Sequence, residues 1–309
     1  MHSGHETSGH IARPTPTRDI EQGKRDLEQF GYAIHRDALS PEQVVKLRER
    51  LEEQAELELE GGVGAYGLAG FNSELTIGSP APAVVPAYQQ VTFLPLKGEV
   101  FRDLLTLPLA HAYVEHVMEG TAYCLATMAG LIVRKGAAEM VTHIDQQPIP
   151  FMTGRPTGLN IMFCLSDFEE DMGATRFAPG SHKGPPPELR FDAAGRPLPG
   201  DREMVPAVAP SGSAILFESR VWHTQGAATS EKTRYSVGTN YVMHFLKPGE
   251  NYPASMPDEI YLSLDDLQKR VLGFEAVHGY GGRLQPRTPA DPRRNTNEDR
   301  PFVPELRRG

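Results

Sequence analysis

After residue 120 the sequence breaks into short apolar runs, and this pattern constrains the fold more than any other feature of the chain. Gly, Pro, Asp or Ser separates most of the runs, which is typical of strands joined by turns. Many short strands with turn signals between them predict an antiparallel sandwich or jelly roll. The expected strands fall within residues 129–135, 141–147, 159–168, 173–180, 203–210, 213–219, 221–226 and 233–245.

Helices are expected only in the first part of the chain. Residues 18–34 predict a short helix that runs into a strand. Ser40 and Gln43 have the spacing of a capping box, which predicts the start of a longer helix at Pro41. Residues 98–119 predict two helical pieces divided at Pro108. The sequence therefore predicts helices packed on a β core.

One domain is expected, spanning residues 18–285. Residues 1–17 are polar and predict a solvated tail, and residues 286–309 form a second tail rich in Pro and Arg. Residues 61–97 are rich in Gly, Pro and aromatic side chains. Such a segment is either a lid or binding loop, or a plain excursion over the surface.

Composition excludes several classes of function. A formal net charge of −9 argues against a nucleic-acid partner, because phosphate binding needs clustered Lys and Arg. No apolar run is long enough to cross a bilayer, and the N-terminus lacks the apolar core of a signal peptide. The two cysteines, Cys124 and Cys164, form no CxxC motif, which argues against a disulfide scaffold or thiolate zinc site and fits a reducing cytoplasm. Oligomeric state cannot be predicted from these features.

The segment MVTHIDQQP, residues 140–148, contains the strongest chemical signal. Alternate side chains of a strand share one face, so His143 and Asp145 would be presented together. An HxD triplet alone is weak evidence, since a strand histidine is more often simply hydrogen-bonded. His223 follows an apolar strand and is the best third ligand. Two histidines and one carboxylate make the facial triad of non-haem iron(II) oxygenases.

Oxygen activation at such an iron needs electrons, which oxidative decarboxylation of 2-oxoglutarate can supply. The distal carboxylate of 2-oxoglutarate needs a fixed cation, preferably a guanidinium. Arg234 lies eleven residues after His223, and a hairpin would return it to the metal. Ser236 alternates onto the same face as Arg234, and either Ser236 or Tyr235 is a candidate to assist Arg234 in binding the cosubstrate. Gln146 either orients the cosubstrate or bonds the backbone.

The segments HIDQ, DFEEDMGATRFAPGSH and GSAILFESRVWHTQGAATSEKTRYS resemble the phytanoyl-CoA dioxygenase family of iron(II)/2-oxoglutarate oxygenases over roughly residues 24–285. The resemblance implies a double-stranded β-helix, a cupin-like jelly roll. It also implies that His143, Asp145 and His223 bind iron and that Arg234 grips 2-oxoglutarate, while Thr175 matches a position that helps hold the cosubstrate in some relatives. Halogenating relatives lack the carboxylate, so the presence of Asp145 favours hydroxylation or a related oxidation.

The expected function is an enzyme that uses Fe(II), 2-oxoglutarate and O2 to oxidise a C–H bond of a small hydrophobic or amphipathic metabolite, such as those of secondary metabolism. The alternatives are an acyl-CoA or amino-acid hydroxylase of the same family, and a non-oxidative divalent-metal β-barrel protein. Residues 61–95 and 182–201 are expected to cover the barrel mouth. The candidate substrate-binding residues are Tyr66, Phe71, Tyr88 and Phe151.

Overall fold

The computed structural model describes residues 11–66, 75–77, 85–146, 154–188, 190–193, 198 and 200–277, with the side chains of 63–66 and 75–77 excepted. Its first helix, α1 (Ile20–Phe30), begins where the Asp19 side chain accepts a hydrogen bond from the backbone N–H of Glu21. It ends at Gly31, whose φ of 82° suits glycine, and leads directly into β1 (Tyr32–His35). Thr17, expected in the N-terminal tail, already pairs with β1 through the backbone of Ile34.

The other predicted helices are also present. Ser40 and Gln43 form the predicted capping box of α2 (Pro41–Glu60). Pro108 divides α3 (Glu99–Arg102) and a 3-10 turn from α4 (Pro108–Met118). The C-terminal helices were not predicted from the sequence, and they are α5 (Tyr252–Ser255), α6 (Asp258–Ser263) and α7 (Asp266–Val271).

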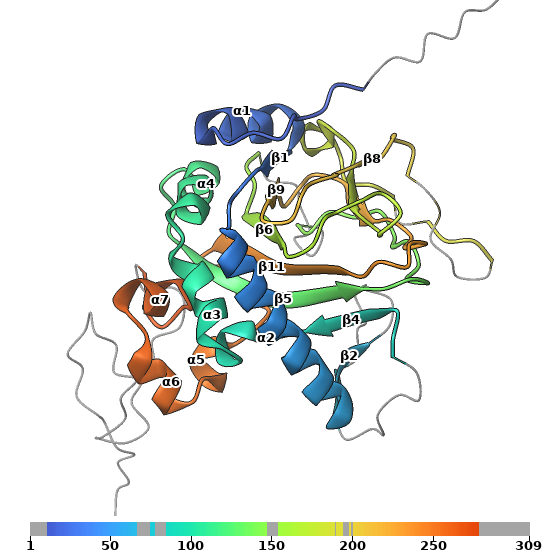
Figure 1. Ribbon diagram of the computed structural model, residues 1–309. Coiled ribbons are helices and arrows are strands. Elements are labelled where there is room, and N and C mark those ends of the chain that lie inside the picture. The colour runs from blue at the N-terminus through green and yellow to red at the C-terminus, as the bar shows by residue number, and fades with distance from the viewer. Residues whose placement is uncertain are drawn as a thin grey trace, which may run out of the picture.

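Two antiparallel sheets form the core of the described part of the chain (Figure 1). The larger has eight strands in the order β1-β9-β6-β11-β5-β4-β2-β3, and the smaller has three in the order β10-β7-β8. The remaining strands of the large sheet are β2 (Val63–Tyr66), β3 (Leu75–Ile77), β4 (Tyr88–Val91), β5 (Tyr123–Val133), β6 (Gly158–Cys164), β9 (Ala214–Glu218) and β11 (Arg234–Met243). Those of the small sheet are β7 (Thr175–Phe177), β8 (Val205–Pro206) and β10 (His223–Gln225).

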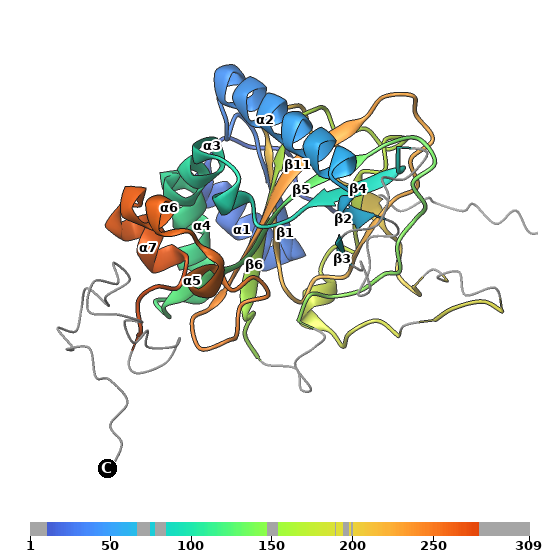
Figure 2. The same cartoon turned by 90° about the horizontal axis from the view of Figure 1, so that it is seen from below.

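The large sheet buries its outer face against the helices. The helix α2 runs across β11, β5 and β4 (Figure 2), and Leu47 and Leu51 enter the main apolar core from it. A Cβ on Gly130 of β5 would lie 2.2 Å from a methyl group of Leu51, so glycine is needed for this close approach. The helical layer thus leaves only the inner face of the large sheet available for a site.

The small sheet packs on that inner face at one end. Phe177 of β7 stacks on Tyr32 of β1 with ring centroids 4.4 Å apart, and it also packs against Phe217 of β9. These aromatic contacts hold the two sheets face to face as a jelly roll. The fold prediction, a mainly β chain with flanking helices and a jelly-roll core, is confirmed.

Three local expectations were wrong. Residues 141–146 of the expected strand 141–147 do not form a strand, and among them only His143 makes an isolated bridge, while residue 147 lies outside the described residues. The strands β10 and β11 do not pair as a hairpin, because β10 pairs with β7 in the small sheet while β11 lies between β5 and β6. Residues 61–97 are not wholly irregular, since β2, β3 and β4 extend the large sheet. None of the helices within the described residues is long and apolar enough to span a membrane.

Candidate metal centre

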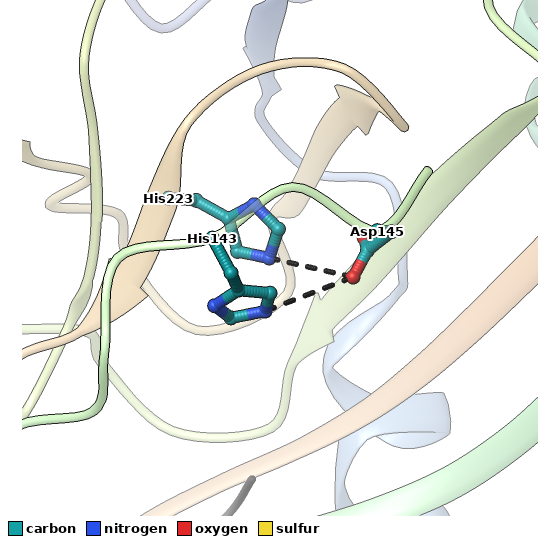
Figure 3. Close-up of side chains that lie close together, drawn as sticks. All are labelled: His143, Asp145 and His223. Carbon is teal, nitrogen blue, oxygen red and sulfur yellow. Dashed lines mark ion pairs between the residues drawn. The ribbon is translucent and has the colours of Figure 1, made fainter. Parts of the chain in front are cut away.

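Three side chains, His143, Asp145 and His223, converge between the two sheets (Figure 3). Oδ1 of Asp145 lies 3.8 Å from Nε2 of His143 and 3.7 Å from Nε2 of His223. One ligand atom of each residue lies within 4.8 Å of the others. Two imidazole nitrogens and one carboxylate oxygen at this spacing can hold a divalent cation on one side and leave the opposite side open.

A backbone bridge places the two histidines. The N–H of each donates to the carbonyl of the other, with both N···O distances 3.0 Å. Asp145 lies in a turn two residues later, where the N–H of Gln146 donates to the carbonyl of Ser219. The triad is therefore assembled by one bridge and one turn, and the strand alternation assumed from the sequence is not its cause.

Each histidine is also fixed by its second ring nitrogen. Nδ1 of His143 lies 2.9 Å from the carbonyl oxygen of Val141, and Nδ1 of His223 lies 3.1 Å from that of Val221. A carbonyl can only accept, so both Nδ1 atoms carry the proton and both Nε2 lone pairs face Asp145. Burial lowers the pKa of His223 to about 4, with Asp145 opposing the shift. His223 is thus neutral at neutral pH, as metal ligation requires.

A cavity of about 510 Å³ opens beside the triad and is lined by both sheets. Across the floor, strand register places Phe217, Asn160, Asn240 and Thr127 in one row on β9, β6, β11 and β5. Gly238 lies in the next row and contributes no side chain, which leaves space above the sheet. The lining combines apolar groups with amides and hydroxyls, so the cavity suits a small organic molecule.

Arg234 lies in the lining of the same cavity and is only 1% exposed. Its guanidinium donates to Oε1 of Gln225 at 3.0 Å and to the carbonyl of Gly173, and it lies 4.8 Å from the ring centroid of Phe168. Burial lowers the pKa of Arg234 to about 10.

Among the described residues no carboxylate pairs with this cation, and its Nε is buried without a hydrogen-bond partner. A buried cation in this state is costly unless an anion joins it. The residues present therefore fit a ligand with one carboxylate at Arg234 and a metal-binding end at the triad, as 2-oxoglutarate has.

Of the other predicted site residues, Thr175 and Tyr88 line the cavity and Ser236 does not. Thr175 lines the cavity, and its hydroxyl lies 3.7 Å from the sulfur of Met162. Tyr88 also lines it, and burial raises the pKa of Tyr88 to about 12. Ser236 is fully buried with an unpartnered hydroxyl, but it is not part of the described lining.

Gln146 is not part of the described cavity lining. Its Oε1 accepts hydrogen bonds from the hydroxyl of Ser219 and from the N–H of Thr157, so the amide oxygen of Gln146 is already hydrogen-bonded within the protein. Phe71 and Phe151 lie outside the described residues, and for Tyr66 the structure describes only the backbone at the end of β2.

Sequence reasoning missed Asn160, Asn240 and Gln225. Asn160 is the one polar residue in the apolar stretch LNIMFC, and Asn240 lies in the mixed stretch SVGTNYVM, so an amide within a largely apolar strand is a usable signal for Asn160. Gln225 lies two residues after His223, so alternation on one strand predicts that both face the same way.

Known proteins are similar to this chain in sequence and in fold. A model of the family described as phytanoyl-CoA dioxygenase matches residues 27–236. The chain is 26% identical over 279 residues to the dioxygenase trt7 of Aspergillus terreus, which covers 87% of this chain and 89% of that protein.

Two solved structures share the fold. The non-heme alpha ketoglutarate dependent carbocyclase SnoK is 19% identical with a TM-score of 0.57, over 79% of this chain and 92% of that one. The epimerase SnoN, solved with Fe3+, alpha ketoglutarate and nogalamycin RO, is 20% identical with a TM-score of 0.54, over 73% and 84%. The predicted cofactors, iron and 2-oxoglutarate, are thus supported by the family match and the triad together.

Proposed function

The chain belongs to the phytanoyl-CoA dioxygenase family, and from this premise we propose that it hydroxylates a C–H bond of a small hydrophobic or amphipathic metabolite with iron(II), 2-oxoglutarate and O2. The observation that carries the proposal is the pairing, in one cavity, of an open His-Asp-His triad with a buried guanidinium that has no carboxylate partner among the described residues. The dioxygenase class follows from the family, whereas the hydroxylation and the substrate are the proposal.

In this proposal the triad would bind the metal and Arg234 would bind the cosubstrate. His143, Asp145 and His223 would hold iron(II), which with 2-oxoglutarate supplies the oxidising power for breaking a C–H bond. Arg234 would bind the distal carboxylate of 2-oxoglutarate by paired N–H donors and so fix its direction in the cavity. Burial of Arg234 strengthens this ion pair, because water does not compete for the guanidinium.

The remainder of the cavity favours an uncharged substrate. Its described lining contains no lysine, and Arg234 is its one permanent cation. Leu131 and Phe217 offer apolar surface, while Gln90 and Thr127 can hydrogen-bond a hydroxyl or carbonyl group. The phosphates of an acyl-CoA or the carboxylate of an amino acid would lack a partner here, so the amphipathic metabolite is the better candidate.

The substrate would be held from above by the segments around the cavity mouth. Tyr88 lies in the lining, and β2 and β4 pair beside it at the edge of the large sheet. Tyr66, Phe71 and Phe151 remain our candidates for substrate contact on the basis of their positions in the sequence. Aromatic side chains there would exclude water and hold the substrate close to the metal.

Metal binding tests the first part of the proposal. Protein reconstituted anaerobically with Fe(II) should bind one iron per chain, and His143→Ala and His223→Ala should lose most of it. His116→Ala is the control, because His116 pairs with Glu28 on the helical side of the molecule. Full iron occupancy in both triad variants would exclude these ligands.

Product analysis tests the second part. A panel of neutral metabolites should contain compounds that stimulate succinate formation and gain one oxygen atom by mass spectrometry. A non-oxidative divalent-metal protein, the second candidate, would bind iron but form no succinate from 2-oxoglutarate under any of these conditions.

A further inference from the structure

The two carboxylate oxygens of Asp145 have different surroundings. Oδ1 faces Nε2 of both histidines, at 3.8 and 3.7 Å. Oδ2 accepts a hydrogen bond from Nδ2 of Asn160 at 2.6 Å. One oxygen is thus directed at the metal position and the other is engaged by the sheet.

Asn160 is itself held by a second amide. Its Oδ1 accepts from Nδ2 of Asn240 at 2.7 Å. The two residues lie directly opposite each other on β6 and β11, two adjacent central strands of the large sheet. A carboxylate can only accept, so Asp145 fixes the direction of both amides, with each NH2 group pointing towards it along the chain. The result is an ordered series, Asn240 to Asn160 to Asp145.

Asp145 needs this support more than the histidines do. His143 and His223 are fixed by their mutual backbone bridge and by their Nδ1 bonds to carbonyl groups. Asp145 follows the bridge in a turn and belongs to neither sheet. Without a bond to Oδ2, a carboxylate is free to rotate and to present both oxygens to a cation.

We propose that Asn160 and Asn240 are positioning residues that hold Asp145 as a one-oxygen ligand. This inference rests on the proposed metal site, and it adds the reason why the site keeps its remaining positions open. The hydrogen bond from Asn160 holds Oδ2 towards the sheet, so Oδ1, which faces both Nε2 atoms, would be the coordinating oxygen. Asn240 acts through Asn160, because its own bond goes to Asn160 and not to the carboxylate.

Cobalt(II) binding tests the proposal, because the visible absorption of Co(II) reports both occupancy and coordination number. The variants are Asn160→Leu, Asn240→Leu and the double variant, with Asn160→Ala as a second substitution should the larger side chain impair folding. Asn160 and Asn240 both border the cavity and are only partly buried, so the fold should persist, which thermal melting would confirm.

Asn160→Leu should weaken Co(II) binding by about 10–100-fold, the usual cost of losing a partner of a metal ligand, and should alter the absorption spectrum. Asn240→Leu should change both in the same direction but less. The double variant should match Asn160→Leu, because residues acting in series are not additive. Thr239→Val is the control, since the Thr239 hydroxyl bonds the carbonyl of Ile161 and its loss should not alter Co(II) affinity.

The outcomes distinguish the positioning role of the asparagines from the existence of the metal site. Wild-type protein that binds Co(II), together with Asn160 variants of unchanged affinity and spectrum, would overturn the positioning role and leave the metal site standing. A double variant much weaker than Asn160→Leu would refute the serial arrangement. Wild-type protein that binds neither Co(II) nor Fe(II) would overturn the proposed function as well.

Discussion

Gln225 accepts a hydrogen bond from Arg234 at 3.0 Å and lies two residues after His223 on the same short strand. The strand β10 therefore begins with a candidate metal ligand, His223, and ends with Gln225. Gln225 orients Arg234, the residue expected to bind the carboxylate of the cosubstrate. Both Gln225 and His223 are buried and line the same cavity. The position of the candidate metal ligand relative to the Arg234 guanidinium is in this way set by a single segment of backbone.

Substitution of Gln225 tests this relationship. Gln225→Leu should raise the apparent KM for 2-oxoglutarate by about tenfold, because a hydrogen bond to a charged group contributes about 1.5–3 kcal/mol. Gln225→Glu should raise it further, since the new carboxylate would pair with Arg234 and compete with the cosubstrate. Succinate formation measures both effects. Equal KM values in the wild type and Gln225→Glu would show that Arg234 does not bind 2-oxoglutarate.

Arg234→Met should separate function from stability. Loss of a buried ion pair with the cosubstrate costs on the order of 2–5 kcal/mol, so the apparent KM for 2-oxoglutarate should rise by tens-fold or more. The same change removes a buried cation without a described carboxylate partner, so the free protein should melt at the same or a higher temperature.

Thermal melts with and without 2-oxoglutarate, together with Fe(II), provide the measurement. The wild type should gain stability with the cosubstrate and Arg234→Met should not. Arg176→Met is the control, because Arg176 pairs with Glu170 at 2.6 Å on the outer side of β7 and should not affect the cosubstrate. A cosubstrate-dependent shift that persists in Arg234→Met but vanishes in Arg176→Met would reverse the assignment.

The sequence predicted the chemistry of the site better than its geometry. The histidines and Asp145 were chosen by residue type and order, and those choices depend little on backbone detail. The bridge between His143 and His223 joins residues 80 positions apart in the chain, and no local pattern encodes such a contact. The strand expected at 141–147 is absent from its described part, residues 141–146, because tertiary pairing leaves only His143 of these residues bonded as a strand.

The two cavity-lining asparagines were missed for a related reason. Asn160 and Asn240 can hydrogen-bond each other only because β6 and β11 are neighbours and their register sets the two residues opposite each other. Neither strand order nor register follows from periodicity. The helices α5, α6 and α7 were missed because they are short and gain their stability from packing on the core rather than from length.

His182 should make stability depend on pH. Burial lowers the pKa of His182 from its ordinary 6.5 to about 4, and its Nε2 lies 3.2 Å from the carbonyl of Glu28. Between these two values the unfolded chain binds more protons at this site than the folded protein does. The contribution of His182 is therefore complete above about pH 6.5 and is lost as the pH falls towards 4.

His182→Gln removes this titration. The free energy of unfolding, measured in urea from pH 4 to pH 7, should fall more steeply with acidification in the wild type than in the variant. Two curves that run parallel across this range would show that the histidine does not titrate differently in the folded and unfolded states.

Glu250 should matter for stability alone. Its buried carboxylate accepts hydrogen bonds from the N–H of Phe93, the N–H of Met128 and the hydroxyl of Tyr252. Glu250→Gln would turn an NH2 group towards these donors and should destabilise the fold by on the order of 3 kcal/mol. The KM for 2-oxoglutarate should stay within about twofold of the wild type, since Glu250 accepts from Met128 on the helix-covered side of β5. A large change in KM with unaltered stability would contradict this role.

The segment from residue 61 to residue 95 should control coupling between cosubstrate and substrate. Tyr88 and Gln90 of β4 line the cavity, and β4 pairs with β2, which ends at Tyr66. If aromatic side chains of this segment cover the substrate, Tyr66→Ala or Phe71→Ala should slow substrate hydroxylation far more than substrate-independent 2-oxoglutarate decarboxylation. Misplacement of a reacting group by about 1 Å can cost roughly a hundredfold in rate.

Parallel measurement of succinate and hydroxylated product gives the coupling ratio. Phe245→Ala is the matched control, because Phe245 is an exposed aromatic residue beyond the end of β11, 56% accessible to solvent. The ratio of product to succinate should fall in the Tyr66 and Phe71 variants and stay constant in Phe245→Ala. Should both rates fall together, or neither change, residues 61–95 do not cover the substrate, and selection must then reside in the inward-facing side chains of β5, β6 and β11.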